Sequence, residues 1–353
     1  MVEYDLYMKI QFFEIEKWEE EYVKNSLQNT VNSLQLGFFE NKLNKENLEI
    51  LRSAQNDDVK IISVFVGSKV DKDVIDAFPN LKLITTRSTG LDHIDIKYAN
   101  DNGITVAYVP GYGDNTVAEF AFGLLLALSR KIYLGVDRIK ETGEFSFDGL
   151  QGFDLRGKTI GVVGTGRIGQ HSIKIAKGFD MNVIAFDTFQ NEKLAQELGF
   201  KYVSLDELLG QSDVITIHVP LLPSTYYLIN KENIFKIKKG AILINTARGP
   251  IIETDALVQA LNEGILAGAG LDVLEEEDVI KNEKEFLLRG HPEGHNMKTV
   301  LENHILMDMP NVLITPHNAF NTKEALQRIL DTDIKNLKSF IENSSSKFPT
   351  PKA

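Results

Sequence analysis

The stretch that most constrains this chain is a glycine-rich turn between a strand-like run and a helix-like run. Residues 158–169 read KTIGVVGTGRIG, and the apolar run breaks at Gly164, Gly166 and Gly169 before a segment with helical spacing. In this context Gly-x-Gly-x-x-Gly allows a tight turn, a close approach of backbone to a pyrophosphate, and close packing of helix on strand. The first amide groups of the helix would then face an anion. The turn therefore predicts a dinucleotide-binding unit.

An acidic residue after the next strand supports that prediction. The apolar run MNVIAF ends at Asp187, eighteen residues after Gly169. A dinucleotide fold places there the carboxylate that holds the ribose hydroxyls; the alternative is an acid that merely ends a strand. Asp187 would repel a 2′-phosphate, and residues 188–190, TFQ, supply no cation to hold one. NAD is therefore favoured over NADP as the cofactor.

Strand-like and helix-like segments alternate on both sides of a Gly- and Pro-rich break at residues 110–114. The alternation covers residues 8–109 and resumes from Lys158 to the run NVLIT at 311–315. It predicts parallel sheets covered by helices on both faces. With 353 residues, the chain is long enough for two cores of ordinary size. We therefore expect an α/β protein of two doubly wound parallel-sheet domains, of which the second is the dinucleotide-binding, or Rossmann, domain.

Composition argues against several classes of function. The formal net charge is -12 and no Lys/Arg-rich stripe is evident, which argues against binding to nucleic acid. The absence of cysteine excludes disulfides, thiolate catalysis and Cys-based zinc sites. The acidic N-terminus does not resemble a secretory signal, and the apolar run at 120–128 is too short to span a bilayer. We expect a cytoplasmic protein without membrane or nucleic-acid partners.

Two regions fall outside the alternating pattern. His291 and His295 lie in the stretch RGHPEGHN, where Pro292 and Gly294 deny them a common helix face and no third ligand is evident. A solvated loop, with no metal, is expected there. The tail NSSSKFPTPKA, residues 343–353, is expected to be frayed.

Three polar residues stand just past apolar strands in the second half of the chain. Arg248 follows AILINTA, Glu277 follows GAGLDVLEE, and His317 follows NVLITP. The carboxyl ends of parallel strands lie on the side of the sheet that carries the glycine turn. We therefore expect these three side chains to converge on a bound nicotinamide.

Hydride reduction of a 2-oxo acid needs these three residue types. A guanidinium holds a carboxylate bidentately, a histidine gives a proton to the developing alkoxide, and a neighbouring carboxylate stabilises the imidazolium form. Taken singly, each residue has a simpler interpretation. Arg248 would be a turn residue, Glu277 one of four consecutive acids, and His317 a helix-capping residue after Pro316.

Together the motifs resemble those of the D-isomer-specific 2-hydroxyacid dehydrogenases, in particular the D-lactate dehydrogenase branch. The matching stretches are VVGTGRIG, SDVITIHVPLLPST, AILINTARGPIIETDAL, GLDVLEEE and NVLITPHNAF, in the family's order. The resemblance implies that Arg248, Glu277 and His317 are the catalytic arginine, glutamate and acid/base histidine. It also implies NAD contacts at the glycine turn and at later strand ends, namely Gly164, Gly166, Arg167, Ile168, Gly169, Asp187, Val219, Pro220, Thr225, Thr246, Ala247 and Asp272.

The resemblance further implies how the two domains are divided. Residues 1–112 plus 320–353 would form a flavodoxin-like substrate domain, and residues 113–319 the Rossmann domain, with a cleft between them that closes around substrate. Substrate carboxylate would meet the backbone of Thr89 and Gly90, with Tyr112 nearby. The helix expected over Thr116–Arg130, capped by Asn115 or Thr116, would lie at the interface of a homodimer.

The expected substrate is pyruvate, reduced to D-lactate. Phe65 and Phe320 match pocket-wall positions, and two large rings leave room for a methyl group; the alternative is that both are ordinary core aromatics. Three departures from the family pattern bear on the substrate: Asp278 in place of a common proline, forty positions between Glu277 and His317, and Asn318 where threonine is frequent. Alternative substrates are branched-chain 2-oxo acids, which would give products such as 2-hydroxyisocaproate, and hydroxypyruvate, which would give glycerate. Glyoxylate and phosphohydroxypyruvate are further alternatives. Another class is an NAD-sensing, corepressor-like binding protein.

Overall fold

The computed structural model describes residues 8–27, 34–47, 58–281 and 295–350, and the chain divides into two compact units. The first unit comprises Met1–Tyr112 with Thr322–Ala353, and the second comprises Gly113–Asn321. The second boundary lies two residues later than the sequence suggested. The Asn321 amide donates to the Asn318 carbonyl at 3.0 Å, which keeps residues 320 and 321 in the turn that precedes them.

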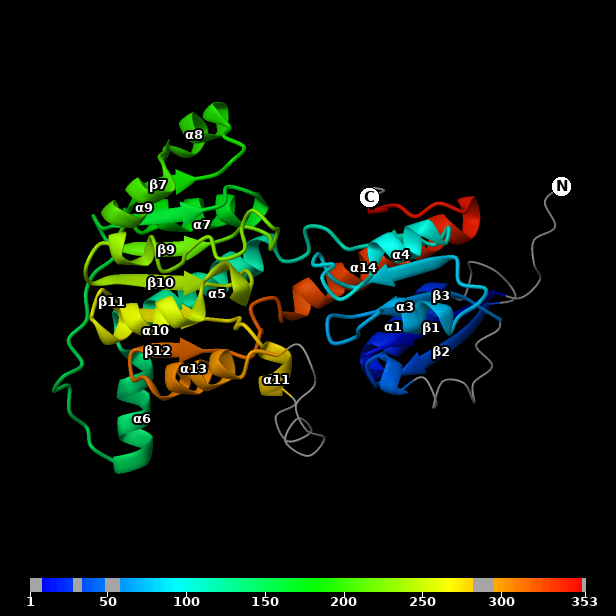
Figure 1. Cartoon of the computed structure of the whole chain (residues 1–353), viewed down its shortest axis with the longest axis horizontal. Coiled ribbons are helices and arrows are strands. Elements are labelled where there is room, and N and C mark those ends of the chain that lie inside the picture. Colours follow the sequence, from blue (N-terminus) through cyan, green and yellow to red (C-terminus); the bar gives the residue numbers. More distant parts are fainter. Residues whose placement is uncertain (1–7, 28–33, 48–57, 282–294, 351–353) are drawn as a thin grey trace. The chain divides into compact units, whose positions relative to one another are not determined.

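The first unit is a five-stranded parallel sheet in the order β2-β1-β3-β4-β5 (Figure 1). This order reverses between β1 and β3, as in flavodoxin-like folds. Its elements are β1 (Met8–Phe13), α1 (Lys17–Leu27), β2 (Leu34–Phe39), η1 (Lys45–Asn47), β3 (Val59–Val64), α3 (Lys72–Asp76), β4 (Leu83–Thr86), α4 (Ile96–Asp101), β5 (Thr105–Ala107) and α14 (Lys323–Asn343).

Alternation along the strands divides the core of the first unit between two faces of the sheet. On β1, Ile10 and Phe12 pack with α1 and α14, whereas Phe13 packs in the cluster that includes α3 and α4. This is the period-two pattern of a strand buried on both faces. The last helix of the chain thus completes a sheet built from its first hundred residues.

The C-terminal tail is ordered as far as Thr350, so the expectation of fraying was wrong for residues 344–350. The Thr350 amide donates to the Val106 carbonyl at 2.8 Å, and Pro349 forms an antiparallel bridge with Ala107. The Phe348 amide donates to the Asn336 side chain at 2.9 Å. These contacts pair the backbone groups on the outer edge of β5. The polar composition of the tail gives no sign of this pairing. Residues 351–353 lie outside the described part of the chain.

The second unit is a seven-stranded parallel sheet in the order β12-β11-β10-β9-β6-β7-β8. The order reverses between β6 and β9, the position at which open α/β sheets bind ligands. Its elements are α5 (Asp114–Ser129), α6 (Ile132–Thr142), β6 (Thr159–Val163), α7 (Arg167–Gly178), β7 (Asn182–Phe186), α8 (Glu192–Leu198), β8 (Lys201–Tyr202), α9 (Leu205–Gln211), β9 (Val214–Ile217), η3 (Ile234–Lys236), β10 (Ala241–Asn245), η4 (Gly249–Ile251), α10 (Thr254–Asn262), β11 (Leu266–Leu271), α11 (Glu277–Lys281), α13 (Met297–Asp308) and β12 (Val312–Ile314).

Helices cover both faces of this second sheet, as expected. One core cluster joins α5 and α7 to the sheet, and the other joins α9, α10 and α13. The helix expected over Thr116–Arg130 begins at Asp114 with Gly113 as its N-cap, so the proposed caps were wrong. The helix α13 was not foreseen, because its polar and apolar residues show little helical periodicity.

Within the described ranges, no helix combines the length and the apolar character that a membrane crossing needs.

The packing of α14 on the first unit predicts a position-specific loss of stability. Leu337 is fully buried among residues of β1, β3 and β4, so Leu337→Ala should lower the free energy of unfolding by about 2–5 kcal/mol. Urea unfolding followed by fluorescence of Trp18, the single tryptophan and a residue of α1, reports on this unit. Lys335→Ala, an exposed change on the same helix, is the control. Equal stabilities of the two variants would contradict this account of α14.

Candidate active site

The glycine turn after β6 has the geometry that close approach of a phosphate requires. Gly164 has φ +95°, and a Cβ there would strike the carbonyl of His218. A Cβ on Gly169 would collide with the carbonyl of Gly164, so the helix packs directly on the turn. Gly166 is exposed, with no heavy atom within 4 Å of its Cβ position, and it is the N-cap of α7. Backbone amides at the start of α7, from Arg167 and Ile168, therefore begin beside open space that suits an anion.

Asp187 stands directly after β7, beside this turn. Its Oδ2 accepts from the backbone amide of Thr165 at 2.7 Å and from the Thr165 hydroxyl at 3.0 Å, while its Oδ1 accepts from the Phe189 amide at 2.9 Å. The carboxylate is half-buried, so its remaining lone pairs are open to a ligand hydroxyl. The geometry fits a dinucleotide whose ribose lies at the end of β7.

The other expected cofactor residues follow β9 and β10. Val219 and Pro220 follow β9 after His218, and the Thr225 hydroxyl donates to the Pro220 carbonyl at 2.6 Å. Thr246 follows β10, and its buried hydroxyl is among the side-chain groups of the described ranges that make no hydrogen bond. A buried, unpaired hydroxyl is costly unless a bound molecule satisfies it. The next residue, Ala247, is held in place because its amide donates to Asn245 Oδ1 at 3.0 Å.

The three expected catalytic residues follow three neighbouring strands. The last residues of these strands are in register, since Asn245 of β10 pairs with Leu271 of β11, and Leu271 pairs with Ile314 of β12. Arg248 comes three residues after Asn245, and His317 three residues after Ile314. Glu277 begins α11, six residues after Leu271. Parallel pairing therefore brings the three loops to one edge of the second sheet.

The structure joins His317 directly to Glu277. The Nδ1 atom of His317 lies 3.0 Å from Oε1 of Glu277, in a hydrogen bond to the carboxylate. Burial alone would raise the pKa of Glu277, but the hydrogen bond and charge of His317, with those of Lys281, lower that pKa to about 2. Glu277 is therefore an ionised acceptor, and Nδ1 is the donor. Nε2 of His317 stands on the opposite edge of the ring, away from the carboxylate.

Asp272 holds the turn that carries His317. Its Oδ1 accepts from the Asn318 amide at 2.8 Å and from the Thr315 hydroxyl, and its Oδ2 accepts from the Ala319 amide at 2.8 Å. His317 adopts φ +53°, a conformation that a side-chain-bearing residue keeps only where its surroundings enforce it. Burial raises the pKa of Asp272, against the opposing effect of these donors. The structure therefore gives Asp272 a supporting part; its contact with NAD stays a prediction.

Arg248 lies in a turn packed against the chain segment that leads to Glu277. A Cβ on Gly249 would collide with the backbone of Leu274 and Glu275, so only glycine permits this approach. The Arg248 carbonyl accepts from the Asn245 side chain at 2.9 Å, and Nη1 of Arg248 donates to the Ala247 carbonyl at 2.8 Å. The backbone at Arg248 is thus fixed, and its guanidinium is bonded on one side to its own loop.

The expected substrate residues of the first unit lie in loops after its strands. Thr89 follows β4, and its hydroxyl donates to the Val109 carbonyl at 2.7 Å, while the Gly90 carbonyl accepts from Ser88 Oγ at 2.7 Å. The Tyr112 carbonyl accepts from Arg328 Nε at 2.7 Å. Phe65 follows β3 and is half-buried. Phe320 belongs to the second unit, where it follows the His317 turn and is half-buried.

Two charged contacts of the site were missed in the sequence. Lys281 pairs with Glu277 across one turn of α11, and the Glu-to-Lys spacing of four residues was a usable signal. Nδ1 of His295 lies 2.6 Å from Oε2 of Glu276, so His295 is paired with a carboxylate rather than only solvated. His291 lies outside the described residues. The parts of the chain that the structure describes hold no group of His, Asp and Glu arranged for a metal ion.

The lowered pKa of Glu277 predicts how stability depends on pH. A carboxyl group whose pKa falls from 4.5 to about 2 on folding contributes stability above pH 4.5 and loses it as the pH falls toward 2. Wild type should therefore be more stable than Glu277→Gln near pH 6, and the difference should shrink between pH 4.5 and 2. Urea unfolding followed by circular dichroism at each pH measures it. A difference that is constant across this range would contradict the charge pairing with His317.

The chain matches known proteins along nearly its whole length. Residues 122–319 match the family model described as "D-isomer specific 2-hydroxyacid dehydrogenase, NAD binding domain". A 2-hydroxyacid dehydrogenase homolog of Haemophilus influenzae is 35% identical over 335 residues, covering 94% of this chain and 95% of that protein. A glyoxylate reductase of Thermofilum pendens is 41% identical over 294 residues, covering 82% of this chain and 80% of that protein.

A solved structure is similar in fold as well as in sequence. The D-lactate dehydrogenase of Aquifex aeolicus, complexed with NAD and lactic acid, superposes with a TM-score of 0.81 at 35% identity, covering 94% of this chain and 95% of that chain. The glycine turn, Asp187 and the open space at Gly166 fit the NAD that this family binds. The protein is therefore an enzyme of the D-isomer-specific 2-hydroxyacid dehydrogenase family, an NAD-dependent oxidoreductase whose second unit is the NAD-binding domain.

Proposed function

We propose that the enzyme reduces pyruvate to D-lactate with NADH. The observation that carries this proposal is the hydrogen bond between His317 and Glu277, at the end of the sheet that holds the glycine turn. A histidine paired with an ionised carboxylate suits an acid that must donate a proton near neutral pH and recover it afterwards. Reduction of a 2-oxo acid requires such a group, because the carbonyl oxygen becomes an alkoxide.

Each of the three residues has one part in the reaction. Arg248 binds the substrate carboxylate through its guanidinium, with the backbone of Thr89 and Gly90 as further donors. His317 donates the proton on Nε2 to the oxygen on C2, and Glu277 stabilises the imidazolium through Nδ1. NADH, when bound, supplies the hydride for C2. In the oxidation of D-lactate, neutral His317 accepts the hydroxyl proton.

The size of the substrate side chain is inferred from two aromatic residues. Phe65 and Phe320 are both half-buried, and in this proposal their rings line the substrate site. Two rings at the substrate leave room for a methyl group but not for a branched chain. The Aquifex aeolicus structure contains lactic acid, whereas the Thermofilum pendens relative is named for glyoxylate, so pyruvate is a choice within the family. Asp187 favours NAD over NADP, because its charge would repel a 2′-phosphate.

The test is NADH oxidation by purified enzyme against pyruvate, 4-methyl-2-oxopentanoate, hydroxypyruvate and glyoxylate, with chiral analysis of the product. We expect a preference for pyruvate and formation of D-lactate. His317→Ala should lose about 10²–10⁴-fold in kcat, since general acid–base catalysis contributes that much, while NADH binding measured by fluorescence is retained.

His304→Ala, a change on α13, is the matched control and should remain active. A preference for another acid would change the proposed substrate but leave the proposed roles of Arg248, Glu277 and His317 unchanged. Full activity of His317→Ala would refute the catalytic assignment. Absence of turnover with every acid would favour the NAD-sensing alternative.

We also propose that an apolar surface on the second unit packs against a second copy of the chain. Ile132, Val136 and Ile139 lie on one stripe of α6 and are 52%, 42% and 48% exposed. Phe145 and Phe147 follow at 93% and 86%. In Figure 1, α6 stands out from the body of this unit. Exposed apolar groups of this extent mark interaction surfaces, so we include a homodimer in the proposal.

The dimer predicts a mass in solution of twice the chain mass, measured by sedimentation or light scattering. Val136→Glu combined with Phe147→Ser should shift that mass to the monomer, because a charge and a polar group would enter the contact. Leu301→Ser, an exposed apolar change on α13, is the control. A monomeric wild type would refute the homodimer. An unchanged dimer in the double variant would instead point to α5, the helix suggested by the sequence.

The cytoplasmic location stays a prediction from composition, and so does the absence of nucleic-acid partners.

A further inference from the structure

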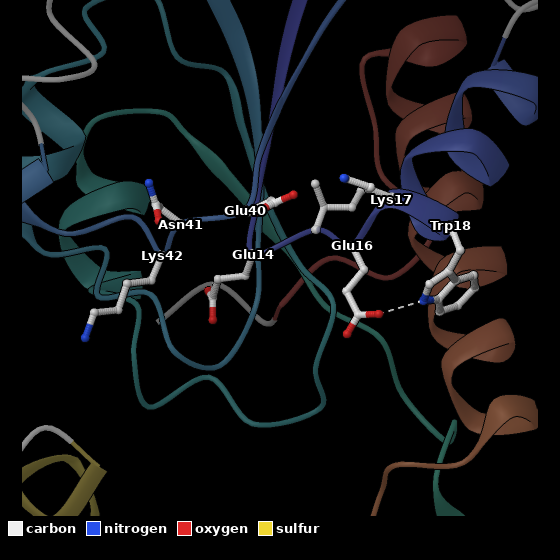
Figure 2. Close-up of a pocket in the computed structure, with 8 residues that line it drawn as sticks. Glu14, Glu16, Lys17, Trp18, Glu40, Asn41 and Lys42 are labelled. Carbon is white, nitrogen blue, oxygen red and sulfur yellow. Dashed lines mark hydrogen bonds between the residues drawn. The ribbon is translucent and has the colours of Figure 1, made fainter.

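Glu14 is an unusual residue at the carboxyl end of β1. Its backbone adopts φ +53°, a conformation that favours glycine, and its amide donates to the Asn41 carbonyl at 3.1 Å. It lines a surface pocket of about 840 Å³ together with Glu16, Lys17 and Trp18 (Figure 2). In that view the Glu14 side chain points away from Glu16, whose carboxylate meets the Trp18 ring nitrogen. A residue with a side chain keeps this backbone conformation only where the surrounding contacts enforce it.

The Glu14 carboxylate binds the turn that follows β3. Its Oε1 accepts from the Gly67 amide at 2.8 Å, and its Oε2 accepts from the Phe65 amide at 3.2 Å and from the Ser68 hydroxyl. The turn also closes on itself, since the Ser68 amide donates to the Phe65 carbonyl at 3.2 Å. Three donors converge on one carboxylate, and charge-assisted hydrogen bonds of this kind are the stronger ones.

Arg87 fixes the other side of Glu14. Its Nη2 donates to the carbonyls of Phe13 and Glu14, each at 2.7 Å, and its Nη1 donates to Ser63 Oγ at 3.1 Å. The Ser63 hydroxyl in turn donates to Asp333 at 2.8 Å. Arg87 is 2% exposed, and its Cζ lies 5.7 Å from the centre of the Phe65 ring. The same buried guanidinium thus contacts both the backbone of Glu14 and the ring of Phe65.

We propose that Glu14 is a positioning residue for substrate selection: its carboxylate holds the turn 65–68 and thereby fixes the Phe65 ring that limits substrate size. The inference rests on the proposed function, in which Phe65 faces the substrate side chain. Glu14 itself does not touch the reacting atoms. Removing its carboxylate should therefore alter substrate binding and selectivity more than the chemical step.

The first test compares Glu14→Gln with Glu16→Gln. The amide at position 14 offers one acceptor and one donor, so at least one donor of the turn loses its partner, whereas Glu16 lies outside this network. We expect Glu14→Gln to raise the KM for pyruvate by roughly tenfold with kcat changed less than about twofold. Its preference for pyruvate over 4-methyl-2-oxopentanoate should fall by a similar factor. Glu16→Gln should behave as wild type.

A second variant tests the same contact from the other side. Around the Cβ position of Gly67, the three nearest heavy atoms all belong to the Glu14 carboxyl group, so Gly67→Ala would displace that group. Gly67→Ala should therefore reproduce the KM effect in wild type and add nothing in a Glu14→Ala background. An equal effect in both backgrounds would show that Gly67 does not act through Glu14, and would overturn the proposal.

Hydrogen exchange on the enzyme without substrate separates this inference from the proposed function. Amides in peptides covering residues 62–70 should exchange faster in Glu14→Gln than in wild type, and Glu16→Gln should leave them unchanged. If wild type reduces none of the 2-oxo acids, the proposed function fails, and the exchange still decides whether Glu14 holds the turn. If wild type is active and Glu14→Gln matches it in KM, selectivity and exchange, the proposal is refuted.

Discussion

The hydrogen bonding of one buried carboxylate, that of Asp272, fixes the loop that carries His317 at one end of the second unit. Asp272 follows β11 and collects donors from Thr315, Asn318 and Ala319, which belong to the loop after the neighbouring strand. Those bonds enclose His317 in a backbone conformation that it would not adopt alone. Because β11 and β12 pair in register, the histidine ring then meets Glu277, whose helix begins a few residues beyond Asp272. The parallel pairing of β11 and β12 thus brings the two loops together, and the hydrogen bonds of Asp272 set the backbone conformation of His317.

In both units a buried ionisable side chain binds the loops at the ends of the strands. In the first unit, the buried guanidinium of Arg87 binds the carbonyls of Phe13 and Glu14 at the end of β1 and the hydroxyl of Ser63 near the end of β3. In the second unit, an anion plays that part through Asp272. Each ion is surrounded by partners of the opposite polarity, which offset part of its desolvation, although burial still raises the pKa of Asp272. These hydrogen bonds fix the loops that follow the strands, as precise positioning of a substrate requires.

Much of this organisation could be predicted from the sequence because local patterns determine it. The alternation of apolar strands and helices gave the α/β class, and the glycine turn followed by Asp187 identified the NAD-binding unit. The N-cap of α5 could not be predicted, because Asn115 and Thr116 are better capping residues than Gly113, yet the helix starts before both of them. The helix α13 lacks clear periodicity, and the order of the tail depends on the unpaired edge of β5. The order of the tail arises from a contact between residues far apart in the chain.

The candidate site likewise has parts that the sequence predicts and parts that it does not. The residue types Arg248, Glu277 and His317 were evident from their places after strands, whereas the support given by Asp272 and Glu14 was not. Glu14 bonds to a turn some fifty residues later, and no spacing rule connects the two. Short sequence motifs therefore indicate the reaction type. In our proposal, the selectivity for one substrate depends instead on hydrogen bonds between loops that are far apart in the chain. Relatives of this chain that bear names for different acids, such as a glyoxylate reductase and a D-lactate dehydrogenase, are the expected result of that separation.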